Sequence, residues 1–173
     1  MAIERSTRPI AAARIRTLAR RLLNASTLCA VATASPGSRA HVNTAHFAWS
    51  RTFDLVWLSE PHAKHSRNLR TSATVAIAVY DSNQSWGDPD RGIQLFGAAR
   101  EVVGAAAREA EKTYAKRFPD YNGEFSAYRF YRFRPRRLKL FDEHALGTGV
   151  FVTASASGGQ VAWERTEIYN GSS

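Results

Sequence analysis

The sequence predicts a mainly β protein with inserted helices, in which antiparallel strands form a closed or partly closed barrel. Two observations lead to this fold class. The early strands follow one another through short turns, as in a series of hairpins, instead of alternating regularly with helices. Apolar residues at helical spacing occur in only a few segments of the 173 residues. Neither standard spacing of a glycine-rich phosphate loop is present, so a nucleotide-like ligand would be held in another way.

The N-terminal half supplies the first helix and the first hairpin. Ile15, Leu18 and Leu22 fall on one face of a helix within residues 9–26. The next two strands flank a Pro-Gly turn and therefore form a hairpin. The further elements predicted in this half are the strands Thr27–Ala34, Arg39–Trp49, Leu55–Leu58 and Thr74–Tyr80 and the helix Pro61–Arg70.

The segment between the third and fourth strands combines features of an anion-binding site. Pro61 is expected just inside the helix start, where its missing N–H would have had no partner anyway. Free backbone N–H groups and the positive end of the helix dipole attract phosphate there, and Lys64, His65 and Arg67 add positive charge. A solvated basic helix that joins two strands would have the same composition, so both interpretations remain open.

The C-terminal half is predicted to add longer strands and one further helix. Asp81–Asp90 is a polar loop that contains a tryptophan. Pro135 interrupts an alternating strand, which indicates a bulge or a sheet edge. The predicted elements are the strands Gly92–Val102, Tyr128–Phe141 and Gly147–Ala154, the helix Ala105–Phe118, and a further strand compatible with Val161–Ile168.

Length and a hydrophobic content of 44% fit one globular domain over residues 1–173. Within it we expect an N-terminal helix in residues 1–26, the barrel with its inserted helices in 27–154, and a C-terminal extension in 155–173. No apolar run reaches the roughly 20 residues of a membrane helix, and no signal-peptide core follows the N-terminal charges. Cys29 is the one cysteine and lies in an apolar run, so we expect a buried thiol and a cytoplasmic protein.

Four segments carry a resemblance to a known family by their order and spacing. They are Ala40–Thr44 after the Pro-Gly turn, Leu58–Leu69 with its basic cluster, Ala76–Tyr80, and Trp86–Gly97. The later helix and the strand at Tyr128–Asp142 also fit. The chain resembles the pyridoxamine 5'-phosphate oxidase-like family of FMN-binding proteins, and the resemblance implies an antiparallel split β-barrel.

The resemblance also implies a homodimer that binds FMN at the subunit interface. The implied site residues are Ser59, Lys64, His65 and Arg67 for the phosphate, His41, Val42, Asn43, Thr44 and His46 along the ring and ribityl chain, Gln94 for the flavin, and Trp86 from the other subunit.

The implied function is that of a flavin-dependent oxidoreductase acting on an unidentified small molecule, with a nicotinamide cofactor as one candidate electron donor. Flavin carries its own redox chemistry, so hydride transfer needs no catalytic acid or base and none is assigned. Residues 164–173 do not resemble the arginine- and histidine-bearing end of authentic pyridoxamine phosphate oxidases. Vitamin B6 oxidation is therefore not expected.

Other ligands stay open. His41 and His65 replace stronger cations of those oxidases, which would weaken FMN binding or favour a deazaflavin. A non-catalytic module of the same fold would hold flavin or haem, with His46 or His144 as a haem ligand. A metal site is not expected, because His41 and His46 face opposite sides of one strand.

The net charge of +9 also raises the possibility of a nucleic-acid partner. The residues that would bind it are Arg132, Arg134, Arg136 and Arg137, with Tyr131 and Phe133 as stacking groups. Any half-exposed strand shows the same alternation, so nucleic acid is the least favoured partner.

Overall fold

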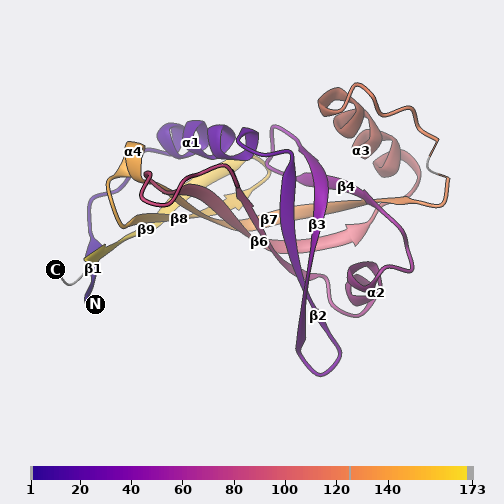
Figure 1. The fold of residues 1–173 in the computed structure, drawn as a ribbon, viewed down its shortest axis with the longest axis horizontal. Coiled ribbons are helices and arrows are strands. Elements are labelled where there is room, and N and C mark those ends of the chain that lie inside the picture. Colours follow the sequence, from indigo (N-terminus) through magenta and orange to yellow (C-terminus); the bar gives the residue numbers. More distant parts are fainter. Residues whose placement is uncertain (1, 125, 171–173) are drawn as a thin grey trace. The chain divides into compact units, whose positions relative to one another are not determined.

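The computed structural model describes residues 2–124 and 126–170, in which strands predominate over helices (Figure 1). The strands are β1 (Ala2–Ser6), β2 (Leu28–Ser35), β3 (Arg39–Trp49), β4 (Leu55–Ser59), β5 (Thr74–Tyr80), β6 (Arg91–Glu101), β7 (Arg129–Asp142), β8 (Val150–Ser157) and β9 (Gln160–Asn170). The helices are α1 (Ala12–Asn24), α2 (Lys64–Thr71), α3 (Gly104–Arg117) and α4 (Glu143–Leu146).

The strands pair in the order β1-β9-β8-β7-β4-β3-β2-β5-β6. Because β6 also pairs with β7, the six strands from β7 to β6 close into a ring. The pairs β2–β3, β3–β4, β4–β7 and β7–β8 are antiparallel, as are β8–β9 and β1–β9. The predicted fold class, a mainly β antiparallel split barrel with inserted helices, is confirmed.

The chain forms two compact units. Unit 1 comprises Met1–Ser26, Ala78–Leu95 and Arg136–Ser173, and unit 2 comprises Thr27–Ile77 and Phe96–Pro135. The expectation of one domain over the whole chain stays a prediction.

Unit 2 contains the predicted hairpin of β2 and β3. Ala34 pairs with Ala40 at its end, and Gly37 in the turn has a φ of +80°, which glycine adopts without steric cost. Its core holds the fully buried side chains of Val31, Phe47, Phe53, Leu55, Trp57, Tyr131 and Phe133.

A close approach within unit 2 explains the glycine at position 97 of β6. A Cβ there would lie 2.1 Å from the carbonyl oxygen of Arg134 and 2.9 Å from Cα of Pro135 in β7. Any larger residue would force the two strands apart, so only glycine fits.

Pro135 marks the point where β7 changes its partner. The strand pairs with β4 up to Phe133 and with β8 from Arg137 onward. Proline has no N–H to give to a ladder, so it fits between two ladders. The predicted interruption of this strand is therefore a change of partner.

Two helices pack on the sheet of unit 2. Helix α2 contacts β2 and β3, and α3 contacts β3 and β4 (Figure 1). The inner face of α3 presents Ala110, Tyr114 and Phe118, which pack against Val56 and Phe130. This agrees with the helical spacing predicted for the segment.

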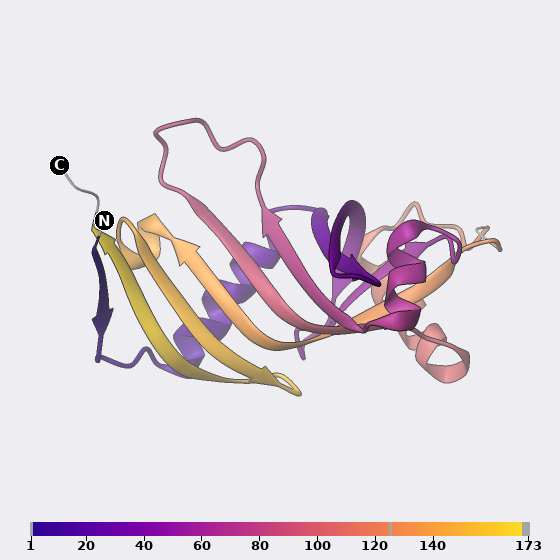
Figure 2. The same cartoon turned by 90° about the horizontal axis from the view of Figure 1, so that it is seen from below.

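In unit 1, helix α1 lies against β9 (Figure 2). Ile15, Leu18 and Leu22 are buried, as their spacing predicted. Strand β1 pairs with β9 along its whole length and was not predicted from the sequence. Of the described residues, no helix combines the length and apolar character that crossing a membrane requires.

Two local predictions are tested directly. Helix α2 begins at Lys64, so the placement of Pro61 inside its first turn is wrong, and Pro61 lies in the preceding turn. Cys29 is buried, as predicted. Burial raises the pKa of the Cys29 thiol to about 12, so it is an unreactive core residue.

Candidate functional site

The start of α2 is open to a ligand. Strand β4 ends at Ser59, and a turn closed by the Ala63 N–H donating to the Glu60 carbonyl (3.2 Å) leads to Lys64. The N-cap residue, Ala63, has no side-chain acceptor, so no side chain caps the helix. The backbone N–H groups of the first turn are left for an external anion.

A buried hydrogen bond links the strand to this helix. Ser59 Oγ and His65 Nε2 are 2.7 Å apart, and both residues are buried. The ring of His41 from β3 stacks on that of His65, with centroids 6.5 Å apart and an interplanar angle of 3°. These three side chains were predicted as site residues, and the structure brings them together.

The expectation that His65 adds positive charge is wrong. Burial is the main factor that lowers the pKa of His65, and the nearby His41 lowers it further. The ring is therefore neutral at neutral pH and acts as a hydrogen-bonding group.

The positive charge of this segment comes from Lys64 and Arg67, which are both exposed. Their helix is held in place by two contacts that the sequence did not reveal. The amide of Asn68 donates to Thr33 Oγ1 of β2 over 3.0 Å, and both residues are buried. Arg70 donates to the Pro61 carbonyl over 2.7 Å and so braces the turn.

The predicted residues of β3 alternate along the strand. His41 and Asn43 are half-buried, whereas Val42, Thr44 and His46 are exposed. Asn43 Oδ1 is buried and has no hydrogen-bond partner in the described part of the chain. An acceptor in this state can pair with a ligand donor once its side chain rotates.

The two histidines of β3 contact different elements. His41 contacts His65, whereas His46 packs edge-on against Phe118 of α3 with ring centroids 5.7 Å apart. No group of three potential metal ligands occurs in residues 2–124 and 126–170.

Trp86 and Gln94 belong to unit 1, whereas the other nine predicted site residues belong to unit 2. Trp86 is fully exposed in the loop between β5 and β6. Gln94 is half-buried in β6.

The prediction that Tyr131 and Phe133 stack on nucleic-acid bases is wrong. Tyr131 and Phe133 are 1% and 0% exposed, so no base can reach them. Tyr131 instead stacks on Trp57, with ring centroids 5.8 Å apart. Arg132 forms an ion pair with Glu109 at 2.9 Å.

Comparison with solved structures supports the fold. A heme binding protein from Mycobacterium smegmatis is 20% identical, with a TM-score of 0.64 over 87% of this chain and 60% of its own. The heme storage protein HutZ from Vibrio cholerae is 18% identical, with a TM-score of 0.61 over 75% of this chain and 93% of its own. An F420 reductase is 19% identical, with a TM-score of 0.54 over 69% of this chain and 94% of its own.

At these identities the likeness concerns the fold alone. No curated protein matches the chain. The family model described as pyridoxamine 5'-phosphate oxidase matches residues 15–142, which span all of α2 and the strands from β2 to β7. Since this match covers well over half of the residues, the chain belongs to the pyridoxamine 5'-phosphate oxidase family.

Proposed function

We propose that this protein binds FMN through the start of α2 and is a flavin-dependent oxidoreductase acting on a small molecule. The observation that carries the proposal is the uncapped first turn of α2, with Ser59 beside it and the cations Lys64 and Arg67 on it. Family membership supports the same ligand.

The donors of this segment fit a phosphate group. A phosphate accepts hydrogen bonds from backbone N–H groups and from cationic side chains at a helix start. With its proton on Nε2, the neutral His65 donates to Ser59 Oγ, and the serine hydroxyl keeps its own proton for a phosphate oxygen. In this role His65 orients Ser59 instead of supplying charge.

The residues of β3 fit the rest of the cofactor. The buried, unpartnered Oδ1 of Asn43 is an acceptor for a ring N–H, after a rotation of its side chain. When bound, flavin supplies the hydride and electron transfer chemistry. The protein's own contribution is to orient the ring and to shape access for the second substrate, with a nicotinamide cofactor as the proposed electron donor.

The end of the chain supports a substrate other than a vitamin B6 phosphate. Arg165 in β9 is engaged with Glu167, with Nε and Oε1 3.1 Å apart. Its neighbour Glu164 pairs with Arg137 at 2.9 Å. An arginine already paired in this way is poorly suited to bind a substrate phosphate.

A deazaflavin or haem is the second candidate ligand. The similar solved structures include an F420 reductase and two heme proteins, which supports a wider ligand range for this fold. His46 and His144 are both exposed and are the residues proposed as haem ligands.

A cytoplasmic location stays a prediction.

An absorption spectrum with an FMN titration followed by fluorescence quenching tests the proposal. Flavin bands and one FMN per subunit are expected. A Soret band with haem and no FMN binding would favour the haem-binding alternative. Binding of a deazaflavin and not of FMN would favour the deazaflavin alternative.

Replacing Lys64 by alanine tests the placement of the phosphate. We expect FMN binding to weaken by roughly 1.5–3 kcal/mol, about a 10- to 150-fold rise in Kd, because a charge-assisted contact is lost. Lys112→Ala, on the exposed side of α3, removes the same charge and should leave Kd unchanged. If Lys64→Ala and Lys112→Ala bind FMN with the same Kd, the phosphate lies elsewhere.

A further inference from the structure

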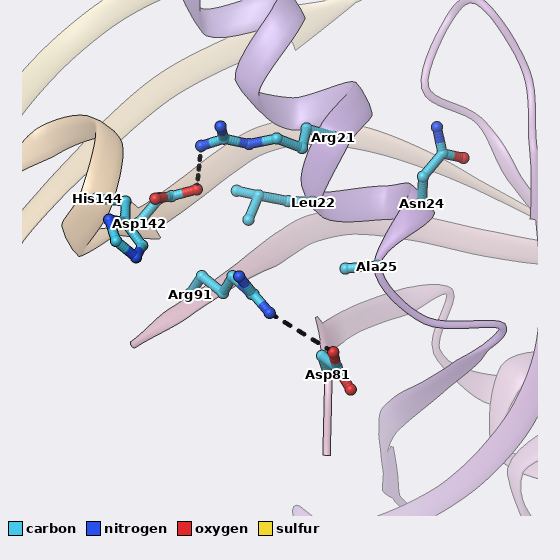
Figure 3. A pocket seen from close by; sticks show the side chains of 8 residues that line it. All are labelled: Arg21, Leu22, Asn24, Ala25, Asp81, Arg91, Asp142 and His144. Atoms are coloured by element: carbon cyan, nitrogen blue, oxygen red, sulfur yellow. Dashed lines mark hydrogen bonds and ion pairs between the residues drawn. The ribbon is translucent and has the colours of Figure 1, made fainter. Parts of the chain in front are cut away.

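Unit 1 contains a pocket of about 380 Å³ that the family resemblance does not explain (Figure 3). Charged side chains from separate segments meet around it. They are Arg21 from α1, Asp81 and Arg91 from the two ends of the β5–β6 loop, Asp142 from the end of β7, and His144 from α4.

Both carboxylate oxygens of Asp142 already accept a hydrogen bond within the protein. Its side chain is 2% exposed. One carboxylate oxygen accepts from Arg21 Nη2 and the other accepts from the Ala145 N–H at 3.1 Å. Asp142 therefore anchors Arg21 and caps α4, and the other N–H groups of Arg21, whose side chain is 59% exposed, remain for a ligand.

Arg91 is only loosely paired. Its Nη2 lies 3.7 Å from Asp81 Oδ2, which exceeds hydrogen-bond distance. The other oxygen of Asp81 already accepts from the Asn83 N–H at 3.0 Å. The side chain of Arg91 is 45% exposed, and the 3.7 Å pair with Asp81 leaves its guanidinium donors available to a ligand.

The positions of Arg91 and Asp81 are fixed by the side chain of Gln84. Its oxygen accepts from the Arg91 N–H at 2.7 Å. Its amide donates to the carbonyls of Asp81 at 2.8 Å and Arg91 at 3.1 Å. One side chain thus holds both ends of the loop, and the guanidinium is presented from a fixed backbone.

The other wall is also anchored. Arg14 of α1 donates to the Ala145 carbonyl of α4 at 2.7 Å. Together with the Arg21–Asp142 pair, this contact ties α4 to α1 and holds His144 at the rim.

The pocket therefore has spare donors on Arg21 and Arg91, while three of the four oxygens on its two carboxylates already accept a hydrogen bond. We propose that it binds a small organic anion through a carboxylate or phosphate group, held between Arg91 and Arg21. The volume exceeds that of a lone ion and leaves room for the rest of a small molecule.

The test is isothermal titration of the whole protein, without FMN, with succinate and with glycerol phosphate as separate probes. We expect at least one probe to bind with a Kd below roughly 1 mM. Succinate alone would identify a carboxylate ligand, and glycerol phosphate alone a phosphate ligand. If neither binds, the proposal is wrong. Because glycerol phosphate could also bind at the start of α2, the Arg91 variants below assign any binding to this pocket and separate this proposal from the proposed cofactor site.

Arg91→Gln is expected to raise the Kd tenfold or more, and Arg91→Lys to raise it by a smaller factor, because lysine keeps the charge but loses the planar fork. Arg108→Gln, at an exposed position of α3, removes the same charge and should change the Kd less than twofold. Equal weakening by Arg91→Gln and Arg108→Gln would show general charge attraction and overturn the site. If Arg91→Gln does not fold, Arg91→Lys decides alone, and an unchanged Kd would overturn the site.

Discussion

His65 shows how burial changes the role of a single residue. Its pKa is lowered mainly by burial, so the folded protein holds the ring neutral while the unfolded chain protonates it near pH 6.5. Below that pH the unfolded state binds more protons than the folded state. Stability is therefore fully present above the unfolded pKa and falls as the pH drops toward the folded pKa.

Replacing His65 by glutamine should flatten this dependence. We expect the wild-type free energy of unfolding to decrease between about pH 7.5 and about pH 5.0, and the decrease to be smaller in His65→Gln. Urea unfolding at each pH measures it. His62→Gln, at an exposed histidine of the preceding turn, is the matched variant for the removal of a histidine. An unchanged slope in His65→Gln would contradict the neutral ring.

The sequence predicted His65 as a site residue, which stays a prediction, and counted it as a positive charge, which its lowered pKa contradicts. Spacing along the chain shows only that Ser59 and His65 flank a turn. It does not show that the turn brings Ser59 Oγ to 2.7 Å from His65 Nε2 in a buried setting. The stacking of His41 is a contact between distant segments, which no local pattern contains. Residue type was therefore predictable here, and protonation state was not.

At the scale of the elements, the attachment of α2 to β2 depends on one buried side-chain pair. We expect Asn68→Ala to lower the free energy of unfolding by about 1–3 kcal/mol, because Thr33 Oγ1 loses its donor. Chemical denaturation of Asn68→Ala, Thr33→Val and the double variant measures the coupling. The neighbouring exposed Arg67→Ala should stay within about 0.5 kcal/mol of wild type. Fully additive effects would show that the pair contributes nothing.

Element prediction succeeded where hydrophobic patterns are strong and failed where pairing alone makes the element. The hairpin of β2 and β3 and the buried face of α1 follow from local signals. Strand β1 does not, since Ile3 is 55% exposed and the strand exists through its ladder with β9. The short helix α4 depends on Asp142, whose capping contact to Ala145 is invisible without the fold.

At the scale of the whole molecule, the proposed homodimer is testable through exposed apolar residues. The family resemblance implies a subunit interface at the cofactor site along β3, where Val42 is 60% exposed, and Leu28 on the paired strand β2 is 44% exposed. We expect Val42→Asp to convert a dimer into a folded monomer in sedimentation velocity. Val103→Asp, at a 73% exposed valine before α3, should leave the dimer intact. A wild-type monomer, or a dimer insensitive to Val42→Asp, would contradict the proposed interface.

Unit 1 is built from segments far apart in the chain, which affects how it folds during synthesis. Its helix α1 lies within the first 26 residues, whereas its partner strand β9 begins at Gln160. Helix α1 emerges from the ribosome long before β9 is synthesised. The apolar face of Ile15, Leu18 and Leu22 therefore lacks this partner strand until nearly the entire chain has been made. Contacts of such high sequence separation form slowly, and a nascent chain halted before β9 would expose this face to chaperones or to aggregation.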